Sequence, residues 1–373
     1  MRYAPFRMER YQSTYEHRVE INVTESGVHP LTVRELLDLA GIADGVDHIR
    51  LGYGQSNGSD ELRARIAALY AGATDANVLV TVGGAEANFA SFWHLLETEG
   101  KAAIILPSYM QVPGLLESFG EQAFPVNLVE SEGWQPDLDA LERALEAGAR
   151  FVLVTNPNNP TGATLTRESR DAVAELTRRH EAWILADEVY SGAEVAGGEP
   201  TPSFWGCHER VLAVNSLSKA YGLPGLRLGW ICGPVELMEG LWGRTDYTTI
   251  SPASLSDHLA RVALEPQTRA RILERTRGII RKNFGLMKEW LEAQGGRFRY
   301  RPPDAGAICY VRYDAPVNST AFAEKMRTEK NVLVVPGDHF GMDSYLRIGT
   351  GNPEDELQEA LRRIREAFDE VAR

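Results

Sequence analysis

Short apolar runs alternate with helical patterns between about residues 60 and 235. The runs are NVLVTV at 77–82, AAIIL at 102–106, FVLVT at 151–155, WILAD at 183–187, VLAVNS at 211–216 and LGWIC at 228–232. Runs that are apolar on both faces are typical of strands in a mostly parallel sheet covered by helices. Leu62, Ile66 and Leu69 recur at helical spacing, and residues 86–97 form another helical pattern. The pattern therefore predicts a large, doubly wound α/β domain.

The pattern changes after Pro252, where long helical stretches run to about Gln294. A mixed unit follows, with apolar runs at 307–313 and 332–336, a helix over 319–330 and a charged helix from about residue 353. Residues 1–44 do not fit the alternating core, and 31–40 predict a separate short helix. We therefore expect a large domain at 45–275 and a second, smaller α+β domain made of 1–44 plus 276–373.

Composition and charge narrow the class of protein. Asp and Glu number 52 against 39 Lys and Arg, a net charge of −13, and no basic run appears, so nucleic acid is not an expected partner. The longest stretch without a charged residue, 151–166, holds two prolines and cannot span a membrane as a helix. The N-terminus shows no signal-peptide core. Three cysteines without metal-ligand spacing indicate a reducing compartment. We expect a cytoplasmic protein with no metal.

Several residues that could take part in catalysis or binding lie where the predicted strands end. Open α/β sheets bind their ligands at this position. Lys219 follows the run at 211–216, and Arg227 lies eight residues further on. A lysine in a dry pocket has its charged form disfavoured, so its amine can act as a nucleophile. Ser216 and Arg227 could bind a phosphate. Taken alone, Lys219 could equally be a solvated surface lysine, so the context decides.

Three further segments supply that context: VGGAEAN at 82–88, NPNNPTG at 156–162 and ADEVYS at 186–191. In this order, with the Lys219 segment and a late arginine in YLRIG at 345–349, they resemble the fold type I pyridoxal-phosphate enzymes of the aminotransferase class I/II family. The resemblance covers essentially the whole chain. It implies pyridoxal 5'-phosphate as cofactor, and an amino acid and a 2-oxo acid as substrates.

The resemblance also implies a role for each matching position. Lys219 would form the internal aldimine and then move the proton at the substrate α-carbon, and Asp187 would pair with the pyridine nitrogen. Asn159 and Tyr190 would hydrogen-bond the phenolic oxygen, and Tyr109 would stack on the ring. The phosphate would be bound by Gly84, Ala85, Ser216 and Arg227, and by Tyr53 from the partner subunit of a homodimer. The substrate would be held by Arg347 at its α-carboxylate, with Asn159 and the backbone of Gly27.

Several of these candidate site residues could instead have a purely structural role. Asp187 could be a helix N-cap, NPNNPTG a plain turn, Tyr109 a rim tyrosine and Arg347 an arginine at a sheet edge. The histidines at 17, 29 and 339 form no metal set.

The leading interpretation is an aminotransferase that works by ping-pong half-reactions. The alternative is a pyridoxal-phosphate lyase or cyclase, because the N-terminal segment at 9–31 loosely resembles enzymes that cyclise hydroxylated arginine. Oxoamine synthases usually show histidine where this chain has Val189 and Tyr109. A regulator would carry a basic helix-turn-helix, and a nicotinamide enzyme would need G-x-G-x-x-G, which 82–88 lacks.

The side chain of the substrate is left open by the motifs. They place no second arginine for a dicarboxylate, and aromatic residues near the rim would suit aromatic or aliphatic substrates. Glu20 or Glu25 could receive a basic side chain.

Overall fold

The computed structural model describes residues 3–372. Its large sheet has eight strands in the order β2-β9-β8-β7-β6-β3-β4-β5. Their bounds are β2 Val78–Thr81, β3 Ala102–Leu106, β4 Phe124–Val129, β5 Gln135–Pro136, β6 Phe151–Thr155, β7 Trp183–Asp187, β8 Val211–Ser216 and β9 Gly229–Cys232. The central strands β4, β3, β6, β7 and β8 are parallel, which confirms the predicted mostly parallel sheet. Strand β9 is antiparallel to both of its neighbours, β2 and β8.

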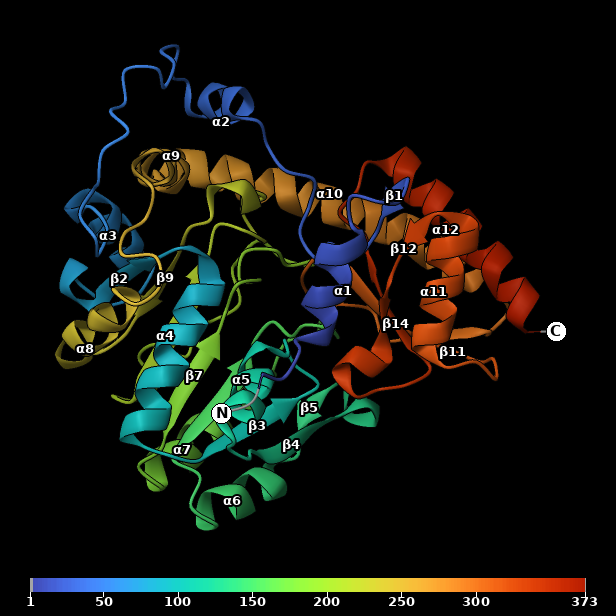
Figure 1. Ribbon diagram of the computed structural model, residues 1–373, viewed down its shortest axis with the longest axis horizontal. Helices are drawn as coiled ribbons and strands as arrows, with labels where there is room; N and C mark the ends of the chain where they lie inside the picture. The colour runs from blue at the N-terminus through green and yellow to red at the C-terminus, as the bar shows by residue number, and fades with distance from the viewer. Residues whose placement is uncertain (1–2, 373) are drawn as a thin grey trace.

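Helices cover both faces of this sheet (Figure 1). Alternate residues of β6 show why: Leu153 packs with the helices α4, α5 and α8, whereas Val152 and Val154 pack with α6 and α7. The bounds of these helices are α4 Gly83–Thr98, α5 Gln111–Phe119, α6 Leu138–Glu146, α7 Arg167–Arg179 and α8 Val235–Thr245. Burial on both faces explains the nearly continuous apolar runs in the sequence.

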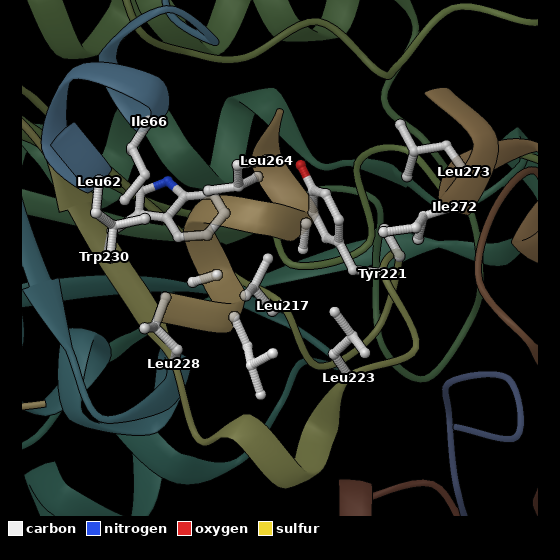
Figure 2. Packing of buried hydrophobic residues seen from close by; sticks show 14 of the residues in the cluster. Leu62, Ile66, Leu217, Tyr221, Leu223, Leu228, Trp230, Leu264, Ile272 and Leu273 are labelled. Atoms are coloured by element: carbon white, nitrogen blue, oxygen red, sulfur yellow. The ribbon is translucent and has the colours of Figure 1, made fainter. Parts of the chain in front are cut away.

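The β2–β9–β8 side of the sheet is covered by α3, α9 and α10. Their bounds are α3 Asp60–Ala67, α9 Ser254–Leu264 and α10 Pro266–Glu292. Figure 2 shows Leu62 and Ile66 of α3 packed around Trp230 of β9, with Leu264 of α9 beside them. Helix α2, Val33–Ala40, begins with a capping box between Thr32 and Glu35, and Leu36 and Leu37 join the same core.

A smaller antiparallel sheet has the order β10-β11-β14-β13. Its strands are β10 Phe298–Tyr300, β11 Ile308–Tyr313, β13 Val335–Pro336 and β14 Tyr345–Gly349, and it packs against α11 Ser319–Lys330 and α12 Glu354–Val371. Beside it, β1 Ile21–Asn22 pairs in parallel with β12 Val332–Leu333. Helix α1, Arg7–Tyr15, lies between this unit and the large sheet (Figure 1).

The described part of the chain also contains four 3₁₀ turns: η1 Asp75–Asn77, η2 Glu130–Glu132, η3 Pro224–Leu226 and η4 Gly337–Phe340. Among residues 3–372, none of the helices combines the length and apolar character needed to cross a bilayer. Helix α10 runs without a break through residue 275, and the division of the chain at that point stays a prediction.

Candidate active site

A cavity of about 450 Å³ lies at the carboxyl ends of the parallel strands β6, β7 and β8. The last residue of each strand, Thr155, Asp187 and Ser216, lines it. The opposite wall comes from α1, from the segment at 25–26 and from Arg347 on β14. The cavity is therefore shared between the large sheet and the smaller unit, at the place where open α/β sheets bind ligands.

Lys219 reaches this cavity because the residues around it are fixed in the core. Leu217, Tyr221 and Leu223 are buried, and Figure 2 shows them directed into the apolar cluster with Ile272 and Leu273. Ser218 and Lys219 lie between these anchors and line the cavity instead. The Lys219 Nζ donates a hydrogen bond to Glu25 Oε2 at 3.4 Å.

The charge on Lys219 depends on two opposing effects. Burial lowers the pKa of the Lys219 amine, but the Glu25 carboxylate and Tyr190 raise it, and the net shift is upward. Lys219 in turn lowers the pKa of Glu25, so the two form an ion pair. The expectation that burial alone keeps the Lys219 amine neutral is therefore wrong for the ligand-free chain. Because Glu25 holds the proton on the amine, that proton has to leave before the nitrogen can react.

Asp187 ends β7 and is only 3% exposed. Asn88 on α4 donates its Nδ2 hydrogen to Asp187 Oδ2 at 2.8 Å, and the Val189 amide donates to Oδ1 at 3.3 Å. Burial raises the pKa of Asp187, and these two donors oppose that shift. A buried carboxylate without a cationic partner is costly, so the site suits a ligand that brings positive charge to Asp187.

The start of α4 forms a cup for an anion. Gly83 and Gly84 make up its first turn, where free backbone N–H groups and the helix dipole favour negative charge. A Cβ on Gly83 would lie 2.6 Å from Arg227 Nη2, and one on Gly84 would lie 3.7 Å from Ser216 Oγ. Both side chains therefore stand directly against the helix start. Their donors and the backbone amides suit a phosphate group.

Arg347 lies on β14, where side chains alternate between the two faces of the sheet. Its neighbours Leu346 and Ile348 point into the core of the smaller unit, so Arg347 points toward the cavity. It is 1% exposed, and it donates to Asn159 Oδ1 at 2.8 Å and to the Thr24 carbonyl at 2.6 Å. Its Nε has no partner among the described residues. A buried guanidinium with a free donor at a cavity wall suits a carboxylate ligand.

Two tyrosines and an asparagine line the cavity between the anion cup at α4 and Arg347. Tyr190 donates its hydroxyl to Ser26 at 2.7 Å, and Tyr109 donates its hydroxyl to Glu9 at 2.9 Å. Burial, followed by the nearby Glu9, raises the pKa of Tyr109, so this phenol stays protonated. Asn159 accepts from Arg347 through its oxygen, which leaves its NH₂ group available to donate to a ligand.

The cavity has the groups that pyridoxal phosphate requires. This cofactor needs an anion cup for its phosphate, an acid for its ring nitrogen, donors for its phenolic oxygen and a lysine for its aldehyde. The cup at α4, buried Asp187, the free Asn159 amide and Lys219 all line one cavity, and the volume is in the range of small-molecule sites. The residues fit the cofactor.

The cavity brings together most residues that the sequence singled out. They are Gly84, Ala85, Tyr109, Asn159, Asp187, Tyr190, Ser216, Lys219, Arg227 and Arg347. Tyr53 does not line it and is 92% exposed. Gly27 does not line it either, although a Cβ there would lie 3.5 Å from Lys219 Cδ. Glu20 lies outside as well, because it is paired with Arg363 at 2.6 Å.

Sequence reasoning missed part of the lining. Asn88 belongs to the quoted segment at 82–88, and its position one turn into the helix was the available signal. The whole α1 wall was missed, including Glu9, Gln12 and Glu16. Their spacing of three and four residues places them on one helical face, but the sequence does not say what that face meets.

Comparison with known proteins agrees with this geometry. The profile of the family "Aminotransferase class I and II" matches residues 33–364. The chain is 32% identical to capreomycidine synthase of Streptomyces vinaceus, over 95% of this chain and 92% of that protein.

Solved structures give the same picture. A pyridoxal-phosphate-dependent aminotransferase from Streptococcus suis superposes with a TM-score of 0.92 at 28% identity, covering 100% of both chains. The pyridoxal-phosphate-dependent cyclase OrfR superposes with a TM-score of 0.88 at 25% identity, covering 99% of this chain and 98% of that one. The chain belongs to the aminotransferase class I and II family, and it is a pyridoxal-phosphate-dependent transferase.

Proposed function

We propose that this protein moves an amino group between an amino acid and a 2-oxo acid, using the residues of the cavity described above. One observation carries the assignment: Lys219, Asp187 and Arg347 come from three separate elements and line a single cavity at the carboxyl edge of the sheet. A reactive amine, a buried acid and a carboxylate-binding arginine are the three groups that this chemistry requires.

Several residues would hold the cofactor. Backbone N–H groups of Gly84 and Ala85, with Ser216 and Arg227, would bind its phosphate. Asp187 would keep a proton on its ring nitrogen, since two opposite charges at about 4 Å and an effective dielectric near 20 attract by about 4 kcal/mol. Asn159 and Tyr190 would donate to its phenolic oxygen, and Tyr109 would pack on its ring. Bound pyridoxal phosphate supplies an electron sink for negative charge at the substrate α-carbon.

The protein residues then position the substrate and move its proton. Arg347 binds the α-carboxylate with two donors, and Asn159 keeps the guanidinium oriented through its 2.8 Å hydrogen bond. Backbone N–H groups near Gly27 close the other side of the carboxylate. The Lys219 amine would act as the general base that takes the proton from the substrate α-carbon, and as the general acid that returns it later in the half-reaction.

We also propose that the smaller unit, residues 1–44 plus 276–373, closes over the large unit at 45–275 when substrate binds. Arg347 and α1 come from the former, and Lys219 and Asp187 come from the latter. A movement between them would therefore change the shape of the cavity and exclude water.

The working form that we propose is a homodimer in the cytoplasm. The side chains of Leu51, Tyr53 and Tyr247 are more than four-fifths exposed, and large exposed apolar side chains mark interfaces. Tyr53 would then reach the phosphate in the partner subunit's cavity. Two of the three cysteines are buried and none is paired, which suits a reducing compartment.

A panel of amino donors with pyruvate or 2-oxoglutarate tests the reaction. We expect the donor's 2-oxo acid and the acceptor's amino acid to form in equal amounts, and each half-reaction to proceed separately. Release of ammonia, or a cyclic product without any new amino acid, would contradict the proposal.

That second outcome defines the alternative function, a lyase or cyclase that uses the same cofactor. The similarity to capreomycidine synthase and to the cyclase OrfR favours it. Both reactions begin with the same substrate complex, and the bond that breaks depends on how the substrate is placed.

A further inference from the structure

Helix α1 presents a polar face to the cavity. Glu9, Gln12 and Ser13 of the helix and its C-cap residue Glu16 all line it, at spacings of three, four and seven residues from Glu9, which place side chains on one side of a helix. Met8 and Tyr11 pack into the apolar cores. A polar face usually meets water, but this one forms a wall of the cavity opposite the reacting lysine.

The charges in the cavity do not balance once the cofactor and the α-carboxylate are assigned. Three cationic groups line it: Arg227 would face the phosphate, Arg347 would face the α-carboxylate, and Lys219 has to give up its proton before its nitrogen can react. Asp187 would face the protonated ring. Three carboxylates, those of Glu9, Glu16 and Glu25, are left without a cation from the protein that faces the cavity.

The present partners of these carboxylates do not neutralise them in the working enzyme. Among residues 3–372, the side chain of Glu9 accepts a hydrogen bond only from the neutral Tyr109 hydroxyl, at 2.9 Å. Glu25 is paired with Lys219 at 3.4 Å, and this partner loses its positive charge when the amine gives up its proton to react. Glu16 lies 3.5 Å from His17, whose side chain is 90% exposed and therefore well hydrated. The side chains of Glu16 and Glu25 are 28% and 50% exposed, so they would lose water when a substrate fills the cavity, and a cationic group on that substrate would offset this cost.

A second observation at the same cavity points to a charged ligand. The Arg347 side chain is 1% exposed, lines the cavity and has an unpartnered Nε among the described residues. A carboxylate placed there fixes one end of an amino acid. Its side chain must then extend along the remaining wall, which is where α1 and Glu25 lie.

Building on the function proposed above, we propose that the amino-acid substrate carries a cationic side chain of the guanidinium type, received by Glu9, Glu16 and Glu25. A guanidinium has five N–H donors in a plane and keeps its charge at all working pH values. It can therefore donate to carboxylates on two different elements, α1 and the segment at 25–26. An ammonium group offers three donors at one point and serves two separate walls less well.

Equilibrium titration of the cofactor-loaded enzyme tests the proposed substrate class. Binding is monitored by the change in the visible absorption of the enzyme. L-arginine and L-citrulline serve as probes, because they have nearly the same shape and only arginine is charged. We expect arginine to bind about 30-fold tighter, the effect of one or more charged hydrogen bonds. Glu9→Gln, Glu16→Gln and Glu25→Gln should each reduce the ratio of the two affinities, with the largest loss in the double variant Glu9→Gln/Glu25→Gln.

The affinity ratio is an internal control, since a variant that harms the fold or Lys219 would weaken both probes alike. Glu20→Gln provides the matched control, because Glu20 is an exposed carboxylate of the same N-terminal segment, paired with Arg363 outside the cavity. It should leave both affinities unchanged.

Equal binding of arginine and citrulline by the wild-type enzyme would overturn the inference, as would an unchanged ratio in all three variants. If neutral amino acids perturb the absorption and arginine does not, the substrate class is wrong and the proposed function stands. If the protein gains no absorption band with pyridoxal phosphate, both the substrate class and the proposed function are wrong.

Discussion

Arg347 keeps a full positive charge with almost no access to water. Its two Nη groups are used by Asn159 and the Thr24 carbonyl, and Nε remains free among the described residues. We expect Arg347→Ala to weaken binding of the amino donor by about 3 kcal/mol or more, roughly 100-fold, because several charged hydrogen bonds are lost. Cofactor absorbance should persist, since Arg347 does not contact the anion cup.

Substrate titration of the loaded variant measures this effect. Arg312→Ala, an exposed arginine on the adjacent strand β11, is the matched control and should bind donors normally. Loss of the cofactor band in Arg347→Ala in parallel with donor affinity would show that the residue supports the structure instead.

Glu188 follows Asp187 directly, and burial raises its pKa to about 7, opposed by donors from Phe204 and Ser203. The ordinary value is 4.5, so the folded state binds more protons between pH 4.5 and 7, and stability falls as pH rises through this range. The shift corresponds to about 3 kcal/mol. Because both donors bond the same oxygen, Glu188→Gln keeps these contacts and should remove that loss.

Urea unfolding of the cofactor-free protein at pH 5 and pH 8 measures the difference. The variant should gain stability over wild type at pH 8 and little at pH 5. The exposed Glu132→Gln is the control. A wild-type pH dependence that survives in Glu188→Gln would refute the assigned pKa.

At the scale of elements, the position of α4 depends on how closely β9 approaches it. A Cβ on Gly229 would lie 2.5 Å from the Gly83 carbonyl carbon and 2.6 Å from the Gly84 nitrogen, both backbone atoms that cannot turn aside. We expect Gly229→Ala to push the helix start out of place, to cost about 1–3 kcal/mol of stability and to weaken phosphate binding markedly.

Equilibrium binding of pyridoxal phosphate and of inorganic phosphate follows this change. Gly243→Ala in α8 is the control, because a Cβ there meets nothing within 4 Å and alanine favours a helix. Normal phosphate binding by a stable Gly229→Ala protein would contradict the role of this contact.

The sequence predicted an element well where the burial of its side chains left a clear periodic pattern. The runs at 151–155 and 183–187 and the helix at 319–330 match β6, β7 and α11 residue for residue, because burial on both faces or on one stripe leaves a clear periodicity. Helix α4 begins three residues earlier than predicted, since two glycines form its first turn. The antiparallel direction of β9 was not predicted, because hydrophobicity does not encode strand direction.

The site residues differ in the same way: those next to strands could be predicted from the sequence, and those on the α1 wall could not. Asp187 ends β7, Lys219 lies three residues after the end of β8, and Arg227 lies two residues before β9, so the sheet places all three at one edge. The α1 wall could not be predicted, because Glu9 and Glu16 form an ordinary polar helical face until the smaller unit brings them against the cavity. Glu20 and Glu25 were equal candidates in the sequence, and only tertiary packing separates them.

At the scale of the whole molecule, exposed apolar side chains gather on two segments held together by hydrogen bonds. Trp242 donates to Ser56, and Ser254 donates to the Arg50 carbonyl, so the loop with Leu51 and Tyr53 lies beside the one with Tyr247 and Ile250. We expect sedimentation to show twice the 41.3 kDa chain mass. Leu51→Glu/Ile250→Glu should shift the protein toward monomers and weaken cofactor binding.

Arg299→Glu, an exposed change on β10 of the smaller unit, should leave the dimer intact. A wild-type monomer that binds the cofactor fully would contradict both the dimer and the role of Tyr53 toward the partner.

Lys219 is the residue that we propose carries the cofactor. Borohydride reduction of the loaded protein, followed by digestion and mass spectrometry, measures where the cofactor is attached. We expect one phosphopyridoxyl group per chain, located on the peptide that contains Lys219, and none in Lys219→Ala. An adduct on a different lysine, or no adduct at all in the wild-type protein, would show that Lys219 does not carry the cofactor.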